Sequence, residues 1–269
     1  MNENLRRDFK ERPIITAFAS VAVLWVLYTV IAFIVFRFFS DPSEMTLRYT
    51  RGLLRVIFSV ASVWLLGYAV GGNGWRYAFT TRGLGAGLFA HLFFFAHAIR
   101  FIPALFVATE INTAFFTRIP AIILFDIGTG IFEEITFRGL LMTAMLIRFG
   151  ATAKGRLACV LLNGAIFGLG HLIGGDWLAV LVTGILGMGF AAAYVYSKNL
   201  LACMLAHMAY NFAIQLTNGF IVDIGNTTAL LLLQISSIVV RGLVLPFAIY
   251  LTIKAKPFEI YKALYKGWK

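Results

Sequence analysis

Residues 119–147, IPAIILFDIGTGIFEEITFRGLLMTAMLI, decide the fold class of this chain because they place two adjacent acids, Glu133 and Glu134, inside a mainly apolar run. About 20 apolar residues suffice to cross a bilayer as a helix. An ionised side chain at the centre of such a helix costs at least about 2.5–3.5 kcal/mol, and charges retained there face the protein interior and mark function. The run therefore predicts a membrane-spanning helix that carries a buried polar site.

The composition of the whole chain agrees with a membrane protein. Of its 269 residues, 60% are hydrophobic and only 13% are charged, whereas a soluble domain has about 45–50% apolar and about 25% charged residues. The net charge of +11 comes from basic residues between the apolar runs, as membrane topology requires, so it does not indicate nucleic-acid binding. The sequence predicts an all-α polytopic protein whose partner is the lipid bilayer.

Eight apolar runs are long enough to be membrane helices, and together they set the topology. They cover roughly residues 14–39, 52–71, 83–109, 119–147, 157–175, 177–197, 199–217 and 228–253. Basic residues precede the first run and follow the last, whereas the loops near 174 and 220 have no Lys or Arg; Arg48 and Arg51 are the exception to this bias. Because cytoplasmic loops carry the excess of basic residues, both termini are predicted to lie in the cytoplasm.

Two histidines in other apolar runs are expected at a depth similar to that of the acids. At a rise of about 1.5 Å per residue, Glu133 and His171 each lie about 21 Å from the predicted cytoplasmic face. His207 lies about 12 Å deep on the same scale, and Asn211, on the same helix face, about 18 Å deep. These residues are therefore expected to converge on one polar cavity within the membrane.

The chemistry of these side chains suits the activation of water. Glu134 and Arg138 are spaced i,i+4 with the acid first, which favours a helical ion pair and leaves Glu133 free to accept a proton from water. A hydrolytic site needs a polar route for water, because the hydrocarbon region offers none. We expect the cavity to open to the cytoplasm or sideways into the lipid rather than to the outside, with a cytoplasmic water route lined by Arg138, Arg148 and Arg156.

The other intramembrane polar residues are read as structural or supporting. Asp126 lies seven residues before Glu133 and so on the same stripe of the helix, where it is placed to support the site. Arg100 and Arg241 are intramembrane cations that either pair with Asp126 or Glu110 or extend toward the membrane surface.

Small residues recur at spacings that let membrane helices approach closely. Gly164 and Gly168 are four apart in the fifth run, and Gly184, Gly187 and Gly189 follow in the sixth. Such spacings are typical of helix–helix contacts in lipid, so these two helices are expected to pack together.

Three motifs of this chain resemble those of a known family. Residues 133–138 have the pattern Glu-Glu-x-x-x-Arg, residues 167–171 have Phe-x-x-x-His, and residues 207–211 have His-x-x-x-Asn. Their order and spacing resemble the CAAX-protease and bacteriocin-processing (Abi) family of intramembrane proteases, which includes the type II CAAX prenyl endopeptidase of eukaryotes. The resemblance covers residues 133–211, with no departure at any motif position.

The resemblance implies a role for each motif residue. It implies that Glu133 is the catalytic acid–base together with His171, and that His207 and Asn211 stabilise the oxyanion. It assigns to Glu134 and Arg138 the support of the helix and of the polarity of the site.

The resemblance also implies a domain organisation and a substrate class. Residues 1–118 would be a variable N-terminal transmembrane region, 119–217 the catalytic core, and 218–269 a final transmembrane helix with a basic cytoplasmic tail, all within one domain. The substrate would be a membrane-associated peptide or protein such as a prenylated CAAX peptide, a pheromone or a bacteriocin.

Three alternatives stay open at this point. Zinc takes carboxylate and imidazole ligands, so a divalent metal between Glu133, His171 and His207 is an alternative to metal-free catalysis. A non-catalytic membrane scaffold or an immunity protein would use the same fold without hydrolysis. A proton-coupled transporter also needs buried acids and histidines, but its halves would be related by an internal repeat, and the sequence shows none.

Overall fold

The computed structural model describes residues 3–39, 43–172 and 175–257. In these residues, six helices are long and apolar enough to cross a membrane, and a seventh span is formed if the bent pair Leu84–Ala90 and Leu92–Val107 counts as one. The one remaining expected span, the fifth run, corresponds to α10, which has 17 residues. The prediction of an all-α, multi-pass integral membrane protein is confirmed. The tail lysines Lys262, Lys266 and Lys269 lie outside the described residues.

The described elements, in chain order, are α1 (Glu3–Glu11), α2 (Pro13–Arg37), α3 (Glu44–Ala69), α4 (Gly74–Ala78), α5 (Leu84–Ala90), α6 (Leu92–Ile99), α7 (Phe101–Val107), β1 (Glu110–Ile111), the 3₁₀ helix η1 (Thr113–Arg118), α8 (Ile119–Glu134), the π-helix η2 (Ile135–Met142), α9 (Thr143–Phe149), α10 (Ala153–Leu169), α11 (Trp177–Ser197), α12 (Leu200–Phe220), β2 (Ile221–Asp223) and α13 (Thr227–Lys254). The two short strands pair antiparallel.

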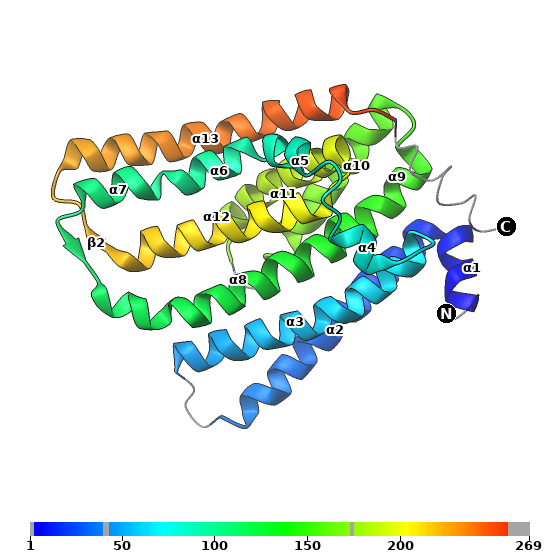
Figure 1. Ribbon diagram of the computed structural model, residues 1–269, viewed down its shortest axis with the longest axis horizontal. Coiled ribbons are helices and arrows are strands. Elements are labelled where there is room, and N and C mark those ends of the chain that lie inside the picture. The colour runs from blue at the N-terminus through cyan, green and yellow to red at the C-terminus, as the bar shows by residue number, and fades with distance from the viewer. Residues whose placement is uncertain (1–2, 40–42, 173–174, 258–269) are drawn as a thin grey trace.

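The long helices run roughly antiparallel and form one bundle (Figure 1). Helices α2 and α3 form a hairpin along one side, and α6, α7, α12 and α13 lie together on another. Helix α1 and the C-terminal end of α13 lie at the same end of the bundle, opposite the β1–β2 pair. An even number of membrane crossings between α1 and the end of α13 has this result.

Two of the expected spans differ from the sequence-based boundaries. The third run bends by 63° between α5 and α6, at His91, where the ring Nδ1 lies 2.7 Å from the carbonyl oxygen of Gly87. The fifth run was expected to be helical over 157–175, but α10 ends at Leu169. His171 therefore lies in a turn after α10, held by a backbone hydrogen bond to Gly168; residues 173–174 are outside the described part of the chain.

Polar caps fix where several helices begin, and one of them also ties two parts of the bundle together. The Asn199 side chain accepts a hydrogen bond from the backbone N–H of Ala202 and so caps α12, as Asn commonly does at helix N-termini. Its amide nitrogen also donates to the carbonyl oxygens of Thr80 and Arg82. The start of α12, two turns before His207, is thereby fixed to the α4–α5 connection.

Glycines allow the helices around the polar core to come into backbone contact. A Cβ added at Gly164 would lie 2.8 Å from the carbonyl oxygen of Gly184, and one at Gly168 would lie 2.9 Å from the Gly184 Cα. The expected close packing of the fifth and sixth runs is thus present between α10 and α11. A Cβ at Gly128 of α8 would lie 2.6 Å from the carbonyl oxygen of Gly52 in α3, so α3 and α8 touch in the same manner.

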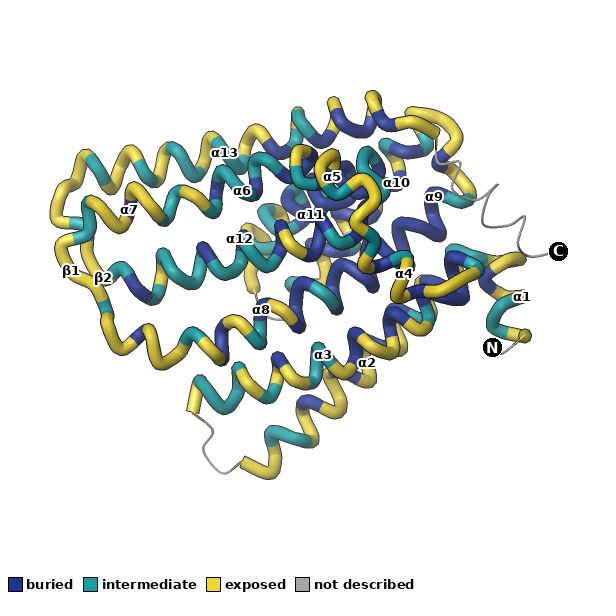
Figure 2. Tube along the Cα trace, viewed as in Figure 1, coloured by how far each residue is buried: buried dark blue, intermediate teal, exposed yellow. Residues whose placement is uncertain are grey.

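The buried part of the molecule is centred on α8, η2, α9 and α11, whereas α13 is exposed along much of its length (Figure 2). All eight residues of η2 are buried. The residues on this segment and its neighbours include polar side chains as well as apolar ones, and these polar side chains form the candidate site.

Candidate active site in the membrane

The two acids stand where an α-helix becomes a π-helix. Helix α8 ends at Glu134, and η2 begins at Ile135. The Thr136 hydroxyl donates to the carbonyl oxygen of Phe132 at 2.8 Å, and that of Thr143 donates to the carbonyl oxygen of Arg138 at 3.2 Å. Wider π turns inside helices occur frequently at functional sites. Here the transition sets the directions of the side chains on either side of it.

Glu134 and Arg138 form the ion pair expected from their spacing. Nη1 of Arg138 lies 3.1 Å from Oε1 of Glu134, and both side chains are fully buried. Nη2 of Arg138 donates to the carbonyl oxygen of Gly187 at 3.0 Å. The guanidinium also lies 4.5 Å above the centre of the Phe167 ring and 5.3 Å from that of Phe190. This arginine therefore connects η2 to α10 and α11.

His207 lies between the two acids. Its Nδ1 is 2.8 Å from Oε1 of Glu134, and its Nε2 is 3.9 Å from Oε2 of Glu133. The ring lies against Phe190, with 5.1 Å between ring centres. A Cβ at Gly130 would meet the Met208 side chain at 2.7 Å, so the glycine lets α12 approach α8 closely enough for these contacts. The ring is thus oriented by Glu134 and presents Nε2 toward Glu133.

Arg55 of α3 is a member of this cluster that the sequence analysis did not single out. Its Nη2 lies 3.8 Å from Oε1 of Glu133, its Nε donates to the Tyr28 hydroxyl at 3.2 Å, and its Nη1 contacts the Thr129 hydroxyl. The signal that could have found it is an arginine within the second apolar run, because intramembrane cations seldom occur without a partner. Glu133 is therefore not free of cations, since one guanidinium lies beside it.

Glu133, Arg55 and His171 line one cavity of about 700 Å³. The remaining walls come mainly from apolar residues of α2, including Trp25 and Val26, and from the segment around His171. Val26 and other α2 residues on this wall are exposed at the bundle surface, so the cavity reaches the lipid-facing side. The polar groups lie at the inner end of a mostly hydrophobic cleft.

The tautomer of His171 follows from its backbone contact. Its Nδ1 lies 2.9 Å from the carbonyl oxygen of Phe167, which can only accept a hydrogen bond, so Nδ1 carries the proton. In the neutral ring Nε2 is then the acceptor. His171 is half-buried and can accept a hydrogen bond from a molecule in the cavity.

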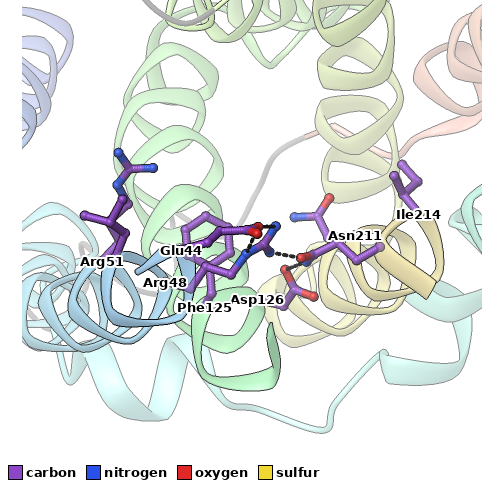
Figure 3. A pocket seen from close by; sticks show the side chains of 9 residues that line it. Glu44, Arg48, Arg51, Phe125, Asp126, Asn211 and Ile214 are labelled. Carbon is purple, nitrogen blue, oxygen red and sulfur yellow. Dashed lines mark hydrogen bonds and ion pairs between the residues drawn. The ribbon is translucent and has the colours of Figure 1, made fainter. Parts of the chain in front are cut away.

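Asn211 lines a different pocket, of about 380 Å³, between α3, α8 and α12. Figure 3 shows its amide and the Asp126 carboxylate extending into this pocket. Gln215 donates to Oδ1 of Asp126 at 2.7 Å and accepts from Arg48. Asp126 thus shares this pocket with Asn211 and has no direct contact with Glu133 among the described residues. The roles of the six motif residues remain predictions.

The expected cytoplasmic channel of arginines is not formed. Arg138 is fully buried in its ion pair with Glu134. Arg156 is 4% exposed and donates to the backbone carbonyls of Gly150 and Ala151. Arg148 alone of the three is exposed. The sequence could not show this, because the contacts that bury Arg138 and Arg156 come from other helices and from helix ends.

The side chains do not form a three-ligand metal site of the kind considered above. The described part of the chain holds no group of three or more His, Cys, Asp or Glu side chains close enough to share a metal ion. Glu133 and His207 approach one another, whereas the His171 ring is held by a hydrogen bond from its Nδ1 to the carbonyl oxygen of Phe167.

Comparison with known proteins bears on the segment that carries all three motifs. Residues 114–213 match the family described as type II CAAX prenyl endopeptidase Rce1-like. No curated protein and no solved structure gives a significant match to the chain. The matched segment is somewhat more than a third of the chain and runs from η1 to α12, through every motif residue. This match over residues 114–213 agrees with the family resemblance that the three motifs predict.

Proposed function

We propose that this protein is an intramembrane endopeptidase that hydrolyses a peptide bond of a membrane-associated substrate with water activated by Glu133. One observation carries the proposal: Glu133 and His171 line the same large cleft, while Nε2 of His207 lies 3.9 Å from the Glu133 carboxylate. A base, an acceptor for water and a potential donor to the substrate thus come together. The Rce1-like match over the same residues supports a protease of this kind.

In the proposed reaction, Glu133 takes a proton from a water molecule held between its carboxylate and Nε2 of His171. The water oxygen forms a bond to the carbonyl carbon of the substrate, and the carbonyl oxygen becomes an oxyanion. Glu133 then gives its proton to the leaving nitrogen as the C–N bond breaks, which releases an amine and a carboxylic acid that ionises by losing its proton to solvent. Transfer of one proton by a positioned carboxylate contributes typically about 10²–10⁴-fold to such reactions.

The oxyanion would be stabilised by donors that surround Glu133. His207 can donate from Nε2 when both ring nitrogens carry a proton, because its Nδ1 is engaged by Glu134. Arg55 supplies guanidinium N–H groups at the wall of the same cleft. Asn211, one turn beyond His207 on α12, would reach the oxyanion only from the neighbouring pocket. Preorganised donors of this kind often make the largest contribution to catalysis.

We further propose that water reaches Glu133 along α3 from the end of the bundle where α3 begins. The Asp126–Gln215–Arg48–Glu44 chain of hydrogen bonds and ion pairs lines the pocket there. Arg55, two turns beyond Arg48 on the same face of α3, contacts both Thr129 and Glu133. These groups provide polar partners over a stretch that would otherwise be apolar.

The walls of the cleft favour a substrate with a hydrophobic group. Phe18, Val21, Trp25 and Val30 of α2 line the cleft opposite the polar end. A lipid-modified or strongly apolar peptide could enter from the bilayer between α2 and the segment after α10. A prenylated CAAX peptide carries such a group, and an apolar peptide pheromone or bacteriocin would also meet this requirement.

Peptide profiling of membranes tests the proposal against a non-catalytic scaffold. Cells that express the wild type are compared with cells that express Glu133→Gln or the control Glu110→Gln, whose acid lies on the exposed strand β1. We expect uncleaved peptides to accumulate only with Glu133→Gln at equal protein levels. If the peptide profiles of wild type, Glu133→Gln and Glu110→Gln are identical, and Glu133→Gln still gives the wild-type phenotype, the non-catalytic scaffold is favoured.

A further inference from the structure

A second polar cavity, of about 280 Å³, lies between α6, α7, α12 and α13, away from the cleft that holds Glu133. Arg100 and Arg241 line it together with His97. The other polar lining residues are all neutral: Thr217, Asn218, Gln234 and Ser237. In Figure 1 the four helices lie side by side near the end of the bundle that carries β1 and β2.

The two arginines of this cavity have no acidic partner among the described residues. Arg100 donates to the Ser236 hydroxyl at 2.8 Å and to the carbonyl oxygen of Leu233, and its Nη1 lies 3.3 Å from Nδ1 of His97. Arg241 contacts the Tyr210 hydroxyl, while its buried Nε has no hydrogen-bond partner. Of the two arrangements expected for these cations, pairing with Asp126 or Glu110 is not formed, since Asp126 binds Gln215 and Glu110 lies exposed on β1.

Other intramembrane arginines of this protein are arranged differently. Arg138 faces Glu134, and Arg55 faces Glu133. Arg100 and Arg241 instead place two positive charges around one cavity within membrane-spanning helices, where an unbalanced charge is costly. Two guanidiniums with amide and hydroxyl groups form a set of donors that suits a phosphate oxygen.

We propose that this cavity binds the phosphate group of an anionic membrane lipid. Its volume is below the range of about 300–1,000 Å³ that is typical of small-molecule pockets, which suits a headgroup rather than an acyl chain. Asn218, Leu230 and Gln234 are exposed at its edge. Large apolar side chains of α7 and α13, among them Phe106 and Leu232, are exposed nearby along the same helices and would accommodate the acyl chains.

A thermal-shift titration of the full-length protein, delipidated in a neutral detergent, tests the proposal. The probes are short-chain phosphatidylglycerol, short-chain phosphatidylcholine and inorganic phosphate, added to wild type, Arg241→Gln, Arg241→Lys and the control Arg37→Gln. Arg37 is exposed at the end of α2, far from the cavity. We expect phosphatidylglycerol to raise the Tm of wild type, and Arg241→Gln to require at least about tenfold more of it, equal to about 1.4 kcal/mol. Arg241→Lys should retain part of the response, and Arg37→Gln all of it.

The probes of the titration distinguish a lipid phosphate from free phosphate. The variants distinguish a binding role of the arginines from a purely structural one. A response to phosphatidylglycerol without one to phosphate supports a lipid, and a Tm rise with phosphate that Arg241→Gln abolishes supports an anion site filled from solution. If Arg241→Gln does not fold, Gln234→Trp, which fills the exposed edge of the cavity, replaces it and should weaken the same response. No response in wild type, or an equal response in wild type and the Arg241→Gln or Gln234→Trp variant, would overturn the proposal.

Discussion

Nδ1 of His207 lies 2.8 Å from Oε1 of Glu134, the same oxygen that Arg138 contacts at 3.1 Å. One carboxylate oxygen therefore holds both a histidine of α12 and an arginine of η2. The i,i+4 spacing of Glu134 and Arg138 predicts their pairing, but not that this carboxylate also orients His207. Glu134 thus connects the buried Arg138 to the His207 ring, which faces Glu133.

Removing Glu134 should affect stability first. Glu134→Ala leaves the buried Arg138 without a counter-charge, and breaking a buried pair in this way costs about 3–5 kcal/mol. We expect a large loss of thermal stability in detergent and a low yield. The double variant Glu134→Leu with Arg138→Met should recover stability but not activity, because His207 still lacks its partner. Full activity in the double variant would show that the orientation of His207 by Glu134 is not needed.

Arg55→Gln should lower peptide hydrolysis by about tenfold or more, because it removes a cation beside Glu133 that corresponds to at least about 1.4 kcal/mol of transition-state stabilisation. Arg55→Lys should restore part of the rate, since it keeps the charge. The rate of substrate cleavage by the purified protein is the measurement, with Arg37→Gln as the control. An unchanged rate in Arg55→Gln would remove Arg55 from the proposed mechanism.

Gly164→Ala should destabilise the contact of α10 with α11. The added Cβ would lie 2.3 Å from Cγ of Met188 and 2.8 Å from the carbonyl oxygen of Gly184, and overpacking of this kind costs typically about 1–3 kcal/mol. Gly242→Ala in α13 is the matched control, because its Cβ would have nothing within 4 Å. Thermal unfolding should show a lower Tm for Gly164→Ala alone. Equal Tm values for the two variants would contradict the close packing of α10 on α11.

Both ends of the bundle can be assigned to a side of the membrane by thiol labelling. The chain has two cysteines, Cys159 and Cys203, and both are buried, so the background should be low. We predict that a membrane-impermeant maleimide added to intact cells labels Asp223→Cys and not Glu3→Cys. The reverse pattern would place the termini outside and would overturn the prediction made from the basic residues.

The fold class and the pairing of Glu134 with Arg138 could be predicted from the sequence because both depend on local patterns. Apolar runs and i,i+4 spacings are read along one helix, and Glu134 with Arg138 is such a case. Arg55 and the bond between His207 and Glu134 could not be predicted, since they depend on how helices from distant segments are aligned. The position of His171 was missed for another reason: the apolar run continues past Leu169, whereas the helix does not.

The central claim is tested most directly by the rate of peptide cleavage by purified, membrane-reconstituted Glu133→Gln. The comparison requires that the Tm of this variant equals that of wild type. The substrate is a peptide identified by the membrane profiling, and Glu110→Gln is the control. Glu133 is proposed to take the proton from water, and an amide cannot, so we predict a loss of at least about 10²-fold, with Glu110→Gln unchanged. Cleavage by Glu133→Gln at the wild-type rate would contradict the account.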